Sequence, residues 1–473
     1  MGSVYIKNGR LVDPAQGIDG MVDILVRDGK VAELIPADPM GSAGSARSAA
    51  ATAEAGADSV IDAAGKIVSP GFIDMHMHED PYIKDEKGRN TGRLASGMAE
   101  SMVLMGVTTE VAGNCGDNFG EPDKYMDDVD TQGTATNVAL LAGHTFLRHM
   151  ANPDSNRYMP VTSDELKKMK YYAQKYISAG CMGVSFGIKY VPGATWNELA
   201  AITALCHEKD LIASAHVRND VGGVFAGGAE LALLGRECGV RTEFSHIGSM
   251  GGYGQMEKLL QDVEGYRKSG VDIMCDCYPY DAFSTKIGET TYDDGFLEAY
   301  DAGYDSVRIC SGKYAGMRCT KEIFDELRAE RPETETIGYF MKSDDISMAL
   351  MCPFVMIGSD GVREGDQGHP RAAGTFPKFF KDYVSSGRIS ISEGIKKMTA
   401  MAAERLHLPA KGNLRVGSDA DIVIFDADNI RDCATYDQPT LPPEGIDFVL
   451  IGGRIAAENG KIVDGHLGRS IRS

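Results

Sequence analysis

Short apolar runs alternate with longer amphipathic segments along most of the chain. Eight such runs occupy residues 67–75, 107–112, 138–142, 182–186, 211–215, 242–245, 271–275 and 354–357. Most of the intervals between them hold about 25 residues with apolar positions at helical spacing, which is the pattern of βαβ units. Residues 163–178 and 256–269 are two of the clearest helical segments. Eight strands, each followed by a helix, predict an α/β fold, a (β/α)8 barrel of the TIM type.

Both ends of the chain have a different pattern, because strand-like segments follow one another there without helices. Residues 4–35 and 419–463 are rich in short strands, and neither segment is large enough to fold alone. We expect residues 1–66 and 413–473 to form one small, composite β-sandwich, which buries the apolar faces of both segments. The barrel would then span residues 67–412.

Two further segments depart from the simple barrel repeat. The interval from about residue 284 to residue 352 is longer than one helix needs, and it predicts a lid-like insertion over the barrel. Residues 40–58 are rich in Ala, Ser and Gly and predict an exposed loop or a weak helix without chemistry.

The composition is that of an ordinary globular protein, with 43% hydrophobic and 25% charged residues. The formal net charge of −20 disfavours binding to nucleic acids or anionic membranes. No apolar run is long enough to cross a membrane, and the first residues resemble a strand rather than a secretory signal. We therefore expect a cytoplasmic protein whose ten cysteines are reduced thiols. We expect no nucleic-acid or membrane partner, and the sequence leaves a homo-oligomer open.

Residues that can bind a metal follow several of the predicted strands, where the active site of a (β/α)8 barrel lies. The first run ends at His76 and His78, which lie two residues apart on one face of a strand, as two ligands of one ion must. Other runs are followed by Cys115, His144, His216, His246 and Asp360. A single histidine at a strand end is more often a packing residue. Since six of the ten histidines lie at or near strand ends, we predict a metal site.

The motifs around these positions resemble a known family. The segment SPGFID followed by HMH is similar to the amidohydrolase superfamily. The set GNCG, GHTFLR, GVSFGIKYVPG, AHVR, FSHI, DCYPY, IGSDG and HPRAAGTFP resembles the N-acyl-D-amino-acid deacylases, also called D-aminoacylases. These matches run in order from about residue 5 to residue 473 and are far more specific than two nearby histidines. The resemblance implies a metal-dependent hydrolase that acts on C–N bonds other than peptide bonds.

The resemblance also implies a role for each candidate ligand. Cys115 would bridge the metals in place of the carboxylated lysine of related enzymes, and His216 and His246 would complete a tightly held zinc site. The second, weaker metal position would consist of His76, His78 and Asp360. A thiolate and two imidazoles suit Zn²⁺, which can lower the pKa of a coordinated water to about 7.

The same resemblance assigns the chemistry of amide hydrolysis. Asp360 would act as general base on the zinc-held water, and the resulting hydroxide would attack the carbonyl carbon. Asp360 would then deliver the proton to the departing amine. Tyr190, in the segment that matches the family's GLxYxPG motif, would donate a hydrogen bond to the carbonyl oxygen as it becomes an oxyanion. We expect zinc-dependent hydrolysis of a linear amide, with N-acyl-D-amino acids as the small-molecule substrates.

Further candidates lie near the predicted mouth of the barrel. His144, in GHTFLR, is a third catalytic candidate. The substrate-binding candidates are Tyr280, Lys286, Arg371 and Arg218. Gly248 departs from the family, whose SHxK motif has a lysine here that pairs with the α-carboxylate of the substrate. Lys286 is the most attractive replacement for this lysine, because it follows the seventh strand.

Two alternatives remain open at this stage. One is a cyclic-amide hydrolase such as a hydantoinase or dihydroorotase, although those enzymes usually bridge their metals with a carboxylated lysine rather than a cysteine. The other is a deacylase relative whose substrates lack a free α-carboxylate, since Gly248 cannot form the ion pair. A barrel without catalysis is disfavoured because every candidate ligand is present. Finally, the acidic residues between Glu289 and Asp305 would disfavour N-acyl-D-glutamate or N-acyl-D-aspartate by charge repulsion.

Overall fold

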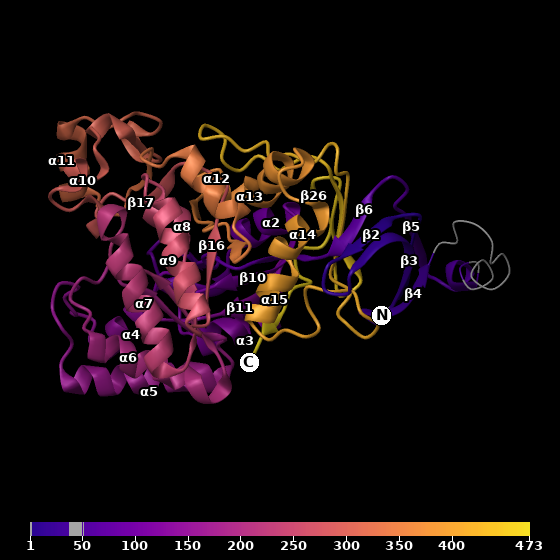
Figure 1. Ribbon diagram of the computed structural model, residues 1–473, viewed down its shortest axis with the longest axis horizontal. Helices are drawn as coiled ribbons and strands as arrows, with labels where there is room; N and C mark the ends of the chain where they lie inside the picture. The colour runs from indigo at the N-terminus through magenta and orange to yellow at the C-terminus, as the bar shows by residue number, and fades with distance from the viewer. Residues whose placement is uncertain (1, 37–49, 51) are drawn as a thin grey trace.

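The computed structural model describes residues 2–36, 50 and 52–473. Most of the loop or weak helix predicted for residues 40–58 lies outside this part of the chain. In Figure 1 the helices that surround the barrel lie to the left, and a separate group of strands from the N-terminal region lies to the right. No helix among the described residues is both long and apolar enough to span a membrane.

Eight parallel strands form the barrel that the apolar runs predict. In chain order they are β7 (Phe72–Asp74), β10 (Val107–Ala112), β11 (Asn137–Leu140) with its continuation β12 (Ala142–Gly143), β13 (Gly183–Gly187), β14 (Ile212–His216), β15 (Arg241–Phe244), β16 (Ile273–Cys277) and β20 (Val355–Ile357). Neighbouring strands pair in parallel from β7 to β20. A parallel bridge between Met77 and Gly361 brings the last strand back to the first. The (β/α)8 barrel is confirmed, and each predicted run overlaps one of its strands.

Helices connect the strands and cover the outside of the barrel (Figure 1). They are α2 (Gly97–Leu104), α3 (Pro122–Gln132), α4 (His144–Ala151), α5 (Ser163–Ala179), α6 (Trp196–Thr203), α7 (Val224–Cys238), α8 (Ile247–Gly251), α9 (Met256–Lys268), α12 (Ser343–Met351), α13 (Arg371–Phe379), α14 (Ile391–Met398) and α15 (Ala400–Arg405). In α5, Thr162 and Glu165 form a capping box that satisfies the first free N–H groups, and Gly180 follows the last turn. Its buried residues, at helical spacing, are Met169, Ala173, Tyr176 and Ile177.

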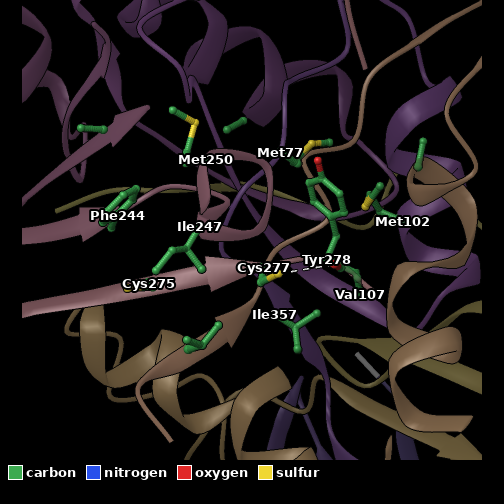
Figure 2. Packing of buried hydrophobic residues seen from close by; sticks show 14 of the residues in the cluster. Met77, Met102, Val107, Phe244, Ile247, Met250, Cys275, Cys277, Tyr278 and Ile357 are labelled. Carbon is green, nitrogen blue, oxygen red and sulfur yellow. Dashed lines mark hydrogen bonds between the residues drawn. The ribbon is translucent and has the colours of Figure 1, made fainter. Parts of the chain in front are cut away.

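Two hydrophobic layers hold the barrel together. The outer layer lies between strands and helices, and Figure 2 shows part of it, where Cys275 and Cys277 of β16 lie near Ile247 of α8. The inner layer fills the barrel and includes Met75 and Met401, the latter from α15. Arg405 of α15 donates a hydrogen bond to the carbonyl of Asp272, just before β16. Helix α15 therefore closes the amino ends of the strands and leaves the carboxyl ends open.

Both chain ends contribute to one further sheet system. Its order is β26-β25-β24-β23-β6-β2-β3-β1-β5, with β4 added to β3. The members are β1 (Ser3–Lys7), β2 (Arg10–Asp13), β3 (Ile18–Arg27), β4 (Lys30–Pro36), β5 (Ser59–Asp62), β6 (Ile67–Pro70), β23 (Ile422–Phe425), β24 (Ile446–Ile451), β25 (Arg454–Glu458) and β26 (Lys461–Ile462). The long β3 pairs with β2 along its first half and with β1 along its second, so it belongs to both layers of the sandwich.

The apolar side chains of this sandwich form their own core, which includes Leu11, Ile24 and Leu450. A small β-sandwich made from both termini is therefore confirmed. Strand β6 pairs with β2 and β23, so residues 67–70 lie in the sandwich sheet although the sequence placed them at the start of the barrel. The exact division into two units, 1–66 with 413–473 and 67–412, stays a prediction.

Between β16 and β20 the chain forms an additional small subdomain. It contains β17 (Phe283–Lys286), α10 (Phe296–Tyr300), β18 (Val307–Ile309), α11 (Lys321–Glu330) and β19 (Glu335–Gly338), and its three strands form an antiparallel sheet. In Figure 1 it lies at the upper left, beyond the ends of the barrel helices. The remaining short strands are β8 (Tyr82–Lys84), β9 (Asn90–Leu94), β21 (Arg363–Glu364), β22 (Gln367–Gly368) and β27 (Ser470–Ile471).

Candidate metal centre

The turns after three barrel strands have an unusual backbone conformation. Cys115 after β10, His246 after β15 and Asp360 after β20 have φ angles of 53°, 34° and 51°. Left-handed backbone is uncommon for residues other than glycine, costs ~1–3 kcal/mol at each position, and clusters at functional sites. Three of the ligands predicted from the sequence therefore adopt this strained backbone conformation just after a barrel strand ends.

Cys115 lies at the centre of the candidate ligands. Its Sγ is 3.4 Å from Nε2 of His76, 3.3 Å from Nε2 of His246 and 3.9 Å from Nδ1 of His216. His76 lies in the turn after β7, His246 lies in the turn after β15, and His216 is the last residue of β14. The barrel therefore brings together residues that are far apart in the sequence. All four side chains are buried, with at most 9% of each residue exposed.

Asp360 completes the cluster from the turn after β20. Its Oδ1 lies 3.5 Å from Nε2 of His76 and 3.3 Å from Nε2 of His78. Its Oδ2 lies 2.8 Å from Nη1 of Arg371, the first residue of α13. Burial alone would raise the pKa of Asp360, but the charges of Arg371 and the neighbouring histidines outweigh burial and hold the pKa well below its ordinary value. The carboxylate is therefore ionised.

The donor atoms fit a zinc ion. Ligand atoms of His76, Cys115, His246 and Asp360 all lie within 4.8 Å of one another. Burial alone would raise the pKa of the Cys115 thiol, but the charges of His76 and His246 lower it well below its ordinary value, which favours the thiolate that metals bind. Thiolate sulfur, imidazole nitrogen and carboxylate oxygen are the ligands that zinc accepts.

A cavity of about 370 Å³ opens beside this cluster. The predicted site residues that line it are His78, Cys115, Tyr190, His216, His246, Lys286, Asp360 and Arg371. The ring of Tyr190 lies 4.5 Å from the ring of His216, measured between centroids. Burial and the charges of Cys115 and Asp360 raise the pKa of Tyr190, so its phenol stays protonated and can donate a hydrogen bond.

Four predicted residues are not among those that line the cavity: His76, which contacts Cys115 and Asp360 directly, and His144, Arg218 and Tyr280. His144 is fully buried, and its Nε2 lies 2.8 Å from Oε1 of Glu198. Arg218 forms an ion pair with Glu230, and the hydroxyl of Tyr280 donates to Oδ2 of Asp432. Each of these contacts ties the side chain to another part of the protein, and the structure offers no contact in support of a catalytic or substrate-binding role for His144, Arg218 or Tyr280.

The surroundings of Lys286 and Gly248 show whether Lys286 can replace the lysine that the family has at position 248. Lys286 lines the cavity, but its Nζ forms an ion pair with Glu333 at 2.6 Å. A Cβ atom at Gly248 would lie 2.8 Å from both Sγ of Cys277 and Cδ1 of Ile346. These atoms fill the place of a side chain, so position 248 cannot take a larger residue without movement of its neighbours.

Sequence reasoning missed the residues that hold the ligands in place. Oδ1 of Asp74 accepts the backbone N–H of His76 and of Ser359, and burial raises the pKa of Asp74 to about 7. Asp276 of β16 contacts both His76 and His246. The sequence signal that could have found them is an acidic residue inside an apolar strand. A buried carboxylate needs specific partners, so such a residue points to a contact in the core.

The fold and the site define a metal-dependent amidohydrolase, and comparisons with known proteins identify its family. The amidohydrolase family profile matches residues 353–457. The N-acyl-D-aspartate deacylase of Alcaligenes xylosoxydans xylosoxydans is 30% identical over 84% of this chain and 83% of its own length. The N-acyl-D-glutamate deacylase of that organism is 29% identical over 84% of this chain and 85% of its own length. The chain belongs to the N-acyl-D-amino-acid deacylase (D-aminoacylase) family of amidohydrolases.

Solved structures agree with this assignment. The N-acyl-D-glutamate deacylase of Bordetella bronchiseptica, complexed with zinc and a phosphonate inhibitor, has a TM-score of 0.84 and 28% identity over 100% of both chains. The L-hydantoinase of Arthrobacter aurescens has a TM-score of 0.64 and 20% identity over 100% of both chains, so it shares the fold alone. Cyclic-amide hydrolases are therefore more distant relatives than the deacylases.

Proposed function

We propose that this protein hydrolyses the amide bond of N-acyl-D-amino acids and uses zinc for the reaction. The observation that carries the proposal is the meeting of Cys115 with His76 and His246 at one end of the barrel, within 3.4 Å of its sulfur. A cysteine at this position matches the deacylase motif GNCG, and two relatives that are 29% and 30% identical over 84% of this chain are named as deacylases of N-acyl-D-glutamate and N-acyl-D-aspartate.

The chain's own residues supply the acid–base chemistry. Zinc held by Cys115, His216 and His246 would act as a Lewis acid and lower the pKa of water to about 7. Asp360 accepts a proton from the attacking water as the water oxygen bonds to the carbonyl carbon. The same carboxyl group then gives this proton to the amine nitrogen as the C–N bond breaks. The products are a carboxylate and a D-amino acid.

Two other side chains act on the substrate. Tyr190, whose phenol stays protonated, donates a hydrogen bond to the carbonyl oxygen as negative charge develops on it. Arg371 binds the α-carboxylate: it is only 1% exposed, it lines the cavity, and its Nε has no hydrogen-bond acceptor in the described structure, while its Nη1 pairs with Asp360. Lys286 is the second candidate, because its exposed ion pair with Glu333 would have to open before it could bind the substrate.

The number of bound metal ions is part of the same proposal. We assign one tightly held zinc and a second, weaker position, with His76, His78 and Asp360 as the ligands of the latter. Metal analysis of protein exchanged into limiting and excess zinc tests this assignment. The cytoplasmic location remains an expectation from the sequence, which leaves a homo-oligomer open.

A panel of amides tests the proposed function. Zinc-reconstituted protein is incubated with N-acetyl, N-formyl and N-carbamoyl derivatives of D- and L-amino acids and with cyclic hydantoins, and amine release or ring opening is measured. We expect turnover in the D series only, because the relatives are named as deacylases of N-acyl-D-amino acids. Turnover of hydantoins alone would contradict the proposal.

One observation favours a second candidate function. Position 248 has no room for the lysine of the family, and Lys286 is paired with Glu333, so a substrate without a free α-carboxylate would also suit the cavity. Adding the α-amides of the same N-acyl-D-amino acids to the panel separates the two candidates. Turnover of the amides, with the free acids inert, would establish the second candidate in place of the first.

A further inference from the structure

The side chain of Asp276 points into the barrel from the penultimate residue of the seventh strand, β16. Its neighbours Cys275 and Cys277 belong to the outer hydrophobic layer, where Figure 2 shows them. Successive side chains of a strand point to opposite faces, so Asp276 points inward. It is fully buried.

Both carboxylate oxygens of Asp276 contact a candidate ligand of the metal. Oδ1 accepts the backbone N–H of His246 at 2.8 Å, and Oδ2 lies 3.3 Å from Nδ1 of His76. No lysine or arginine in the described part of the chain forms an ion pair with Asp276. The two histidines are therefore the chief partners of a buried carboxylate, and burying such a charge without partners is costly.

The contact with His76 fixes which nitrogen of that ring faces the cluster. To bind a metal through Nε2, His76 must keep the lone pair on that nitrogen and carry its hydrogen on Nδ1, where Oδ2 of Asp276 is placed to accept it. That Nε2 is the atom that lies 3.4 Å from Sγ of Cys115 and 3.5 Å from Oδ1 of Asp360. Asp276 therefore aims the lone pair of His76 at the other donor atoms.

The contact with His246 acts on the backbone instead. His246 has a φ of 34°, and the hydrogen bond from its N–H to Asp276 holds this strained turn. Its ring is oriented by a separate contact, because Oγ of Ser249 lies 2.9 Å from Nδ1 and Nε2 lies 3.3 Å from Sγ of Cys115. One carboxylate thus connects the ends of β7, β15 and β16.

The neighbouring strand leaves space for this arrangement. A Cβ atom at Gly358, just after β20, would lie 2.8 Å from Cβ of His76 and 2.9 Å from Oδ1 of Asp276. Only a residue without a side chain allows Asp276 and His76 to approach each other here. The contact between Asp276 and His76 therefore depends on residues from β7, β16 and β20.

We infer that Asp276 is a positioning residue that holds His76 and His246 for metal binding and links the two metal positions of the proposed function. The inference rests on the metal part of that proposal, in which His246 belongs to the tightly held position and His76 to the weaker one. Because one carboxylate serves a ligand of each, its loss weakens metal binding at both positions. Partners of this kind commonly change metal affinity ~10- to 100-fold.

The test replaces the acceptor while keeping its shape. In Asp276→Asn the amide has one acceptor oxygen instead of two, so it cannot accept from both histidines. We expect the dissociation constant for zinc, measured by chelator competition, to rise about 10- to 100-fold. We also expect the visible absorption bands of the Co²⁺-substituted protein to shift, which a structural role alone would not cause.

Glu110→Gln is the matched control. Glu110 is a buried carboxylate of β10 that accepts a hydrogen bond from Thr136, and no contact to a candidate ligand is found for it within the described residues. This variant should keep the zinc affinity and the Co²⁺ spectrum of the parent. Equal effects in both variants, or parental zinc affinity in folded Asp276→Asn, would overturn the inference.

A measurement on the parent protein covers the case in which Asp276→Asn does not fold. Nitrogen-15 NMR of histidine-labelled, zinc-loaded protein reports the tautomer of each ring, with His76 assigned by His76→Asn. We expect hydrogen on Nδ1 of His76, and hydrogen on Nε2 would refute the inference. Neither measurement uses a substrate, so a negative amide panel would leave the inference standing and would count against the proposed function only.

Discussion

At the scale of single residues, His144 shows how burial and partners decide what a histidine does. It follows a barrel strand as the candidate ligands do, but its Nε2 lies 2.8 Å from Oε1 of Glu198, which also accepts from Nε of Arg148 at 2.6 Å. Burial alone would raise the pKa of Glu198, but the hydrogen bonds from His144 and Arg148 outweigh it and lower the pKa to about 2. The three side chains form a buried network that joins α4 to α6.

This network gives a prediction for stability and its pH dependence. A carboxyl group whose pKa is lowered by folding stabilises the protein above its unfolded pKa and loses this effect as the pH falls through the folded pKa. We expect Glu198→Gln to lower the free energy of unfolding by about 3 kcal/mol at pH 7, because it breaks a buried pair. The difference from the parent should shrink between the ordinary pKa of 4.5 and the folded value of about 2.

Thermal unfolding at several pH values, together with kcat at pH 7, measures this effect. Glu86→Gln, at an exposed carboxylate, is the control and should match the parent. A pH-independent loss of stability in Glu198→Gln would argue against the ionised network. A large fall in kcat without loss of stability would instead restore the predicted catalytic role of His144.

At the scale of elements, the strands could be predicted but their ends could not. Each apolar run overlaps a barrel strand, because a run of buried side chains with helices on both sides has few other solutions. The left-handed turns at Cys115, His246 and Asp360 depend on close packing between strands, which no local pattern encodes. For the same reason the sequence missed that β6 joins the sandwich and that the insertion contains an antiparallel sheet.

The turn after β20 provides the prediction at this scale. In Gly358→Ala the new Cβ would meet His76 and Asp276 at 2.8 Å and 2.9 Å, so these side chains must move. We expect the dissociation constant for zinc to rise about 10-fold, the lower end of the range for displaced partners of metal ligands.

The control for this substitution is Gly265→Ala in α9, where a Cβ meets nothing within 4 Å. It should leave zinc affinity unchanged and raise stability by about 0.5–1 kcal/mol, because alanine favours the helix more than glycine does. Chelator competition and thermal unfolding give both quantities. Gly358→Ala with parental zinc affinity would show that the close approach is not needed.

At the scale of the whole molecule, the cavity combines residues from the barrel and the insertion and has an acidic lining. Its carboxylates are Asp117, Asp220, Glu289, Glu333, Glu335 and Asp360, and its cations are Arg157, Lys286 and Arg371. The sequence expected negative charge from residues 289 to 305, but only Glu289 of those acidic residues lines the cavity, where it pairs with Arg157. Carboxylates therefore outnumber cationic side chains in this lining, although most of them come from other elements and the proposed zinc would offset the charge of Asp360.

This charge predicts the side-chain preference of the reaction. N-acetyl-D-glutamine and N-acetyl-D-glutamate have nearly the same shape, so a difference between them reports the charge alone. We expect kcat/KM to be at least about tenfold higher for the glutamine derivative, which corresponds to ~1.4 kcal/mol. The ratio should fall as salt is added, since screening weakens the repulsion. Faster turnover of N-acetyl-D-glutamate would contradict the predicted effect of the cavity charge.

The sequence by itself determined the barrel, the terminal sandwich and the identity of the candidate ligands, because hydrophobic periodicity and short motifs are local properties of the chain. Only the tertiary structure decided which candidates share a cavity. It separated His144, Tyr280 and Arg218 from that cavity, and it brought Asp276 into contact with His76 from 200 residues away. The physical reason is that partners, distances and burial depend on how strands distant in the chain pack together, and these contacts set the charge and orientation of every side chain at the site.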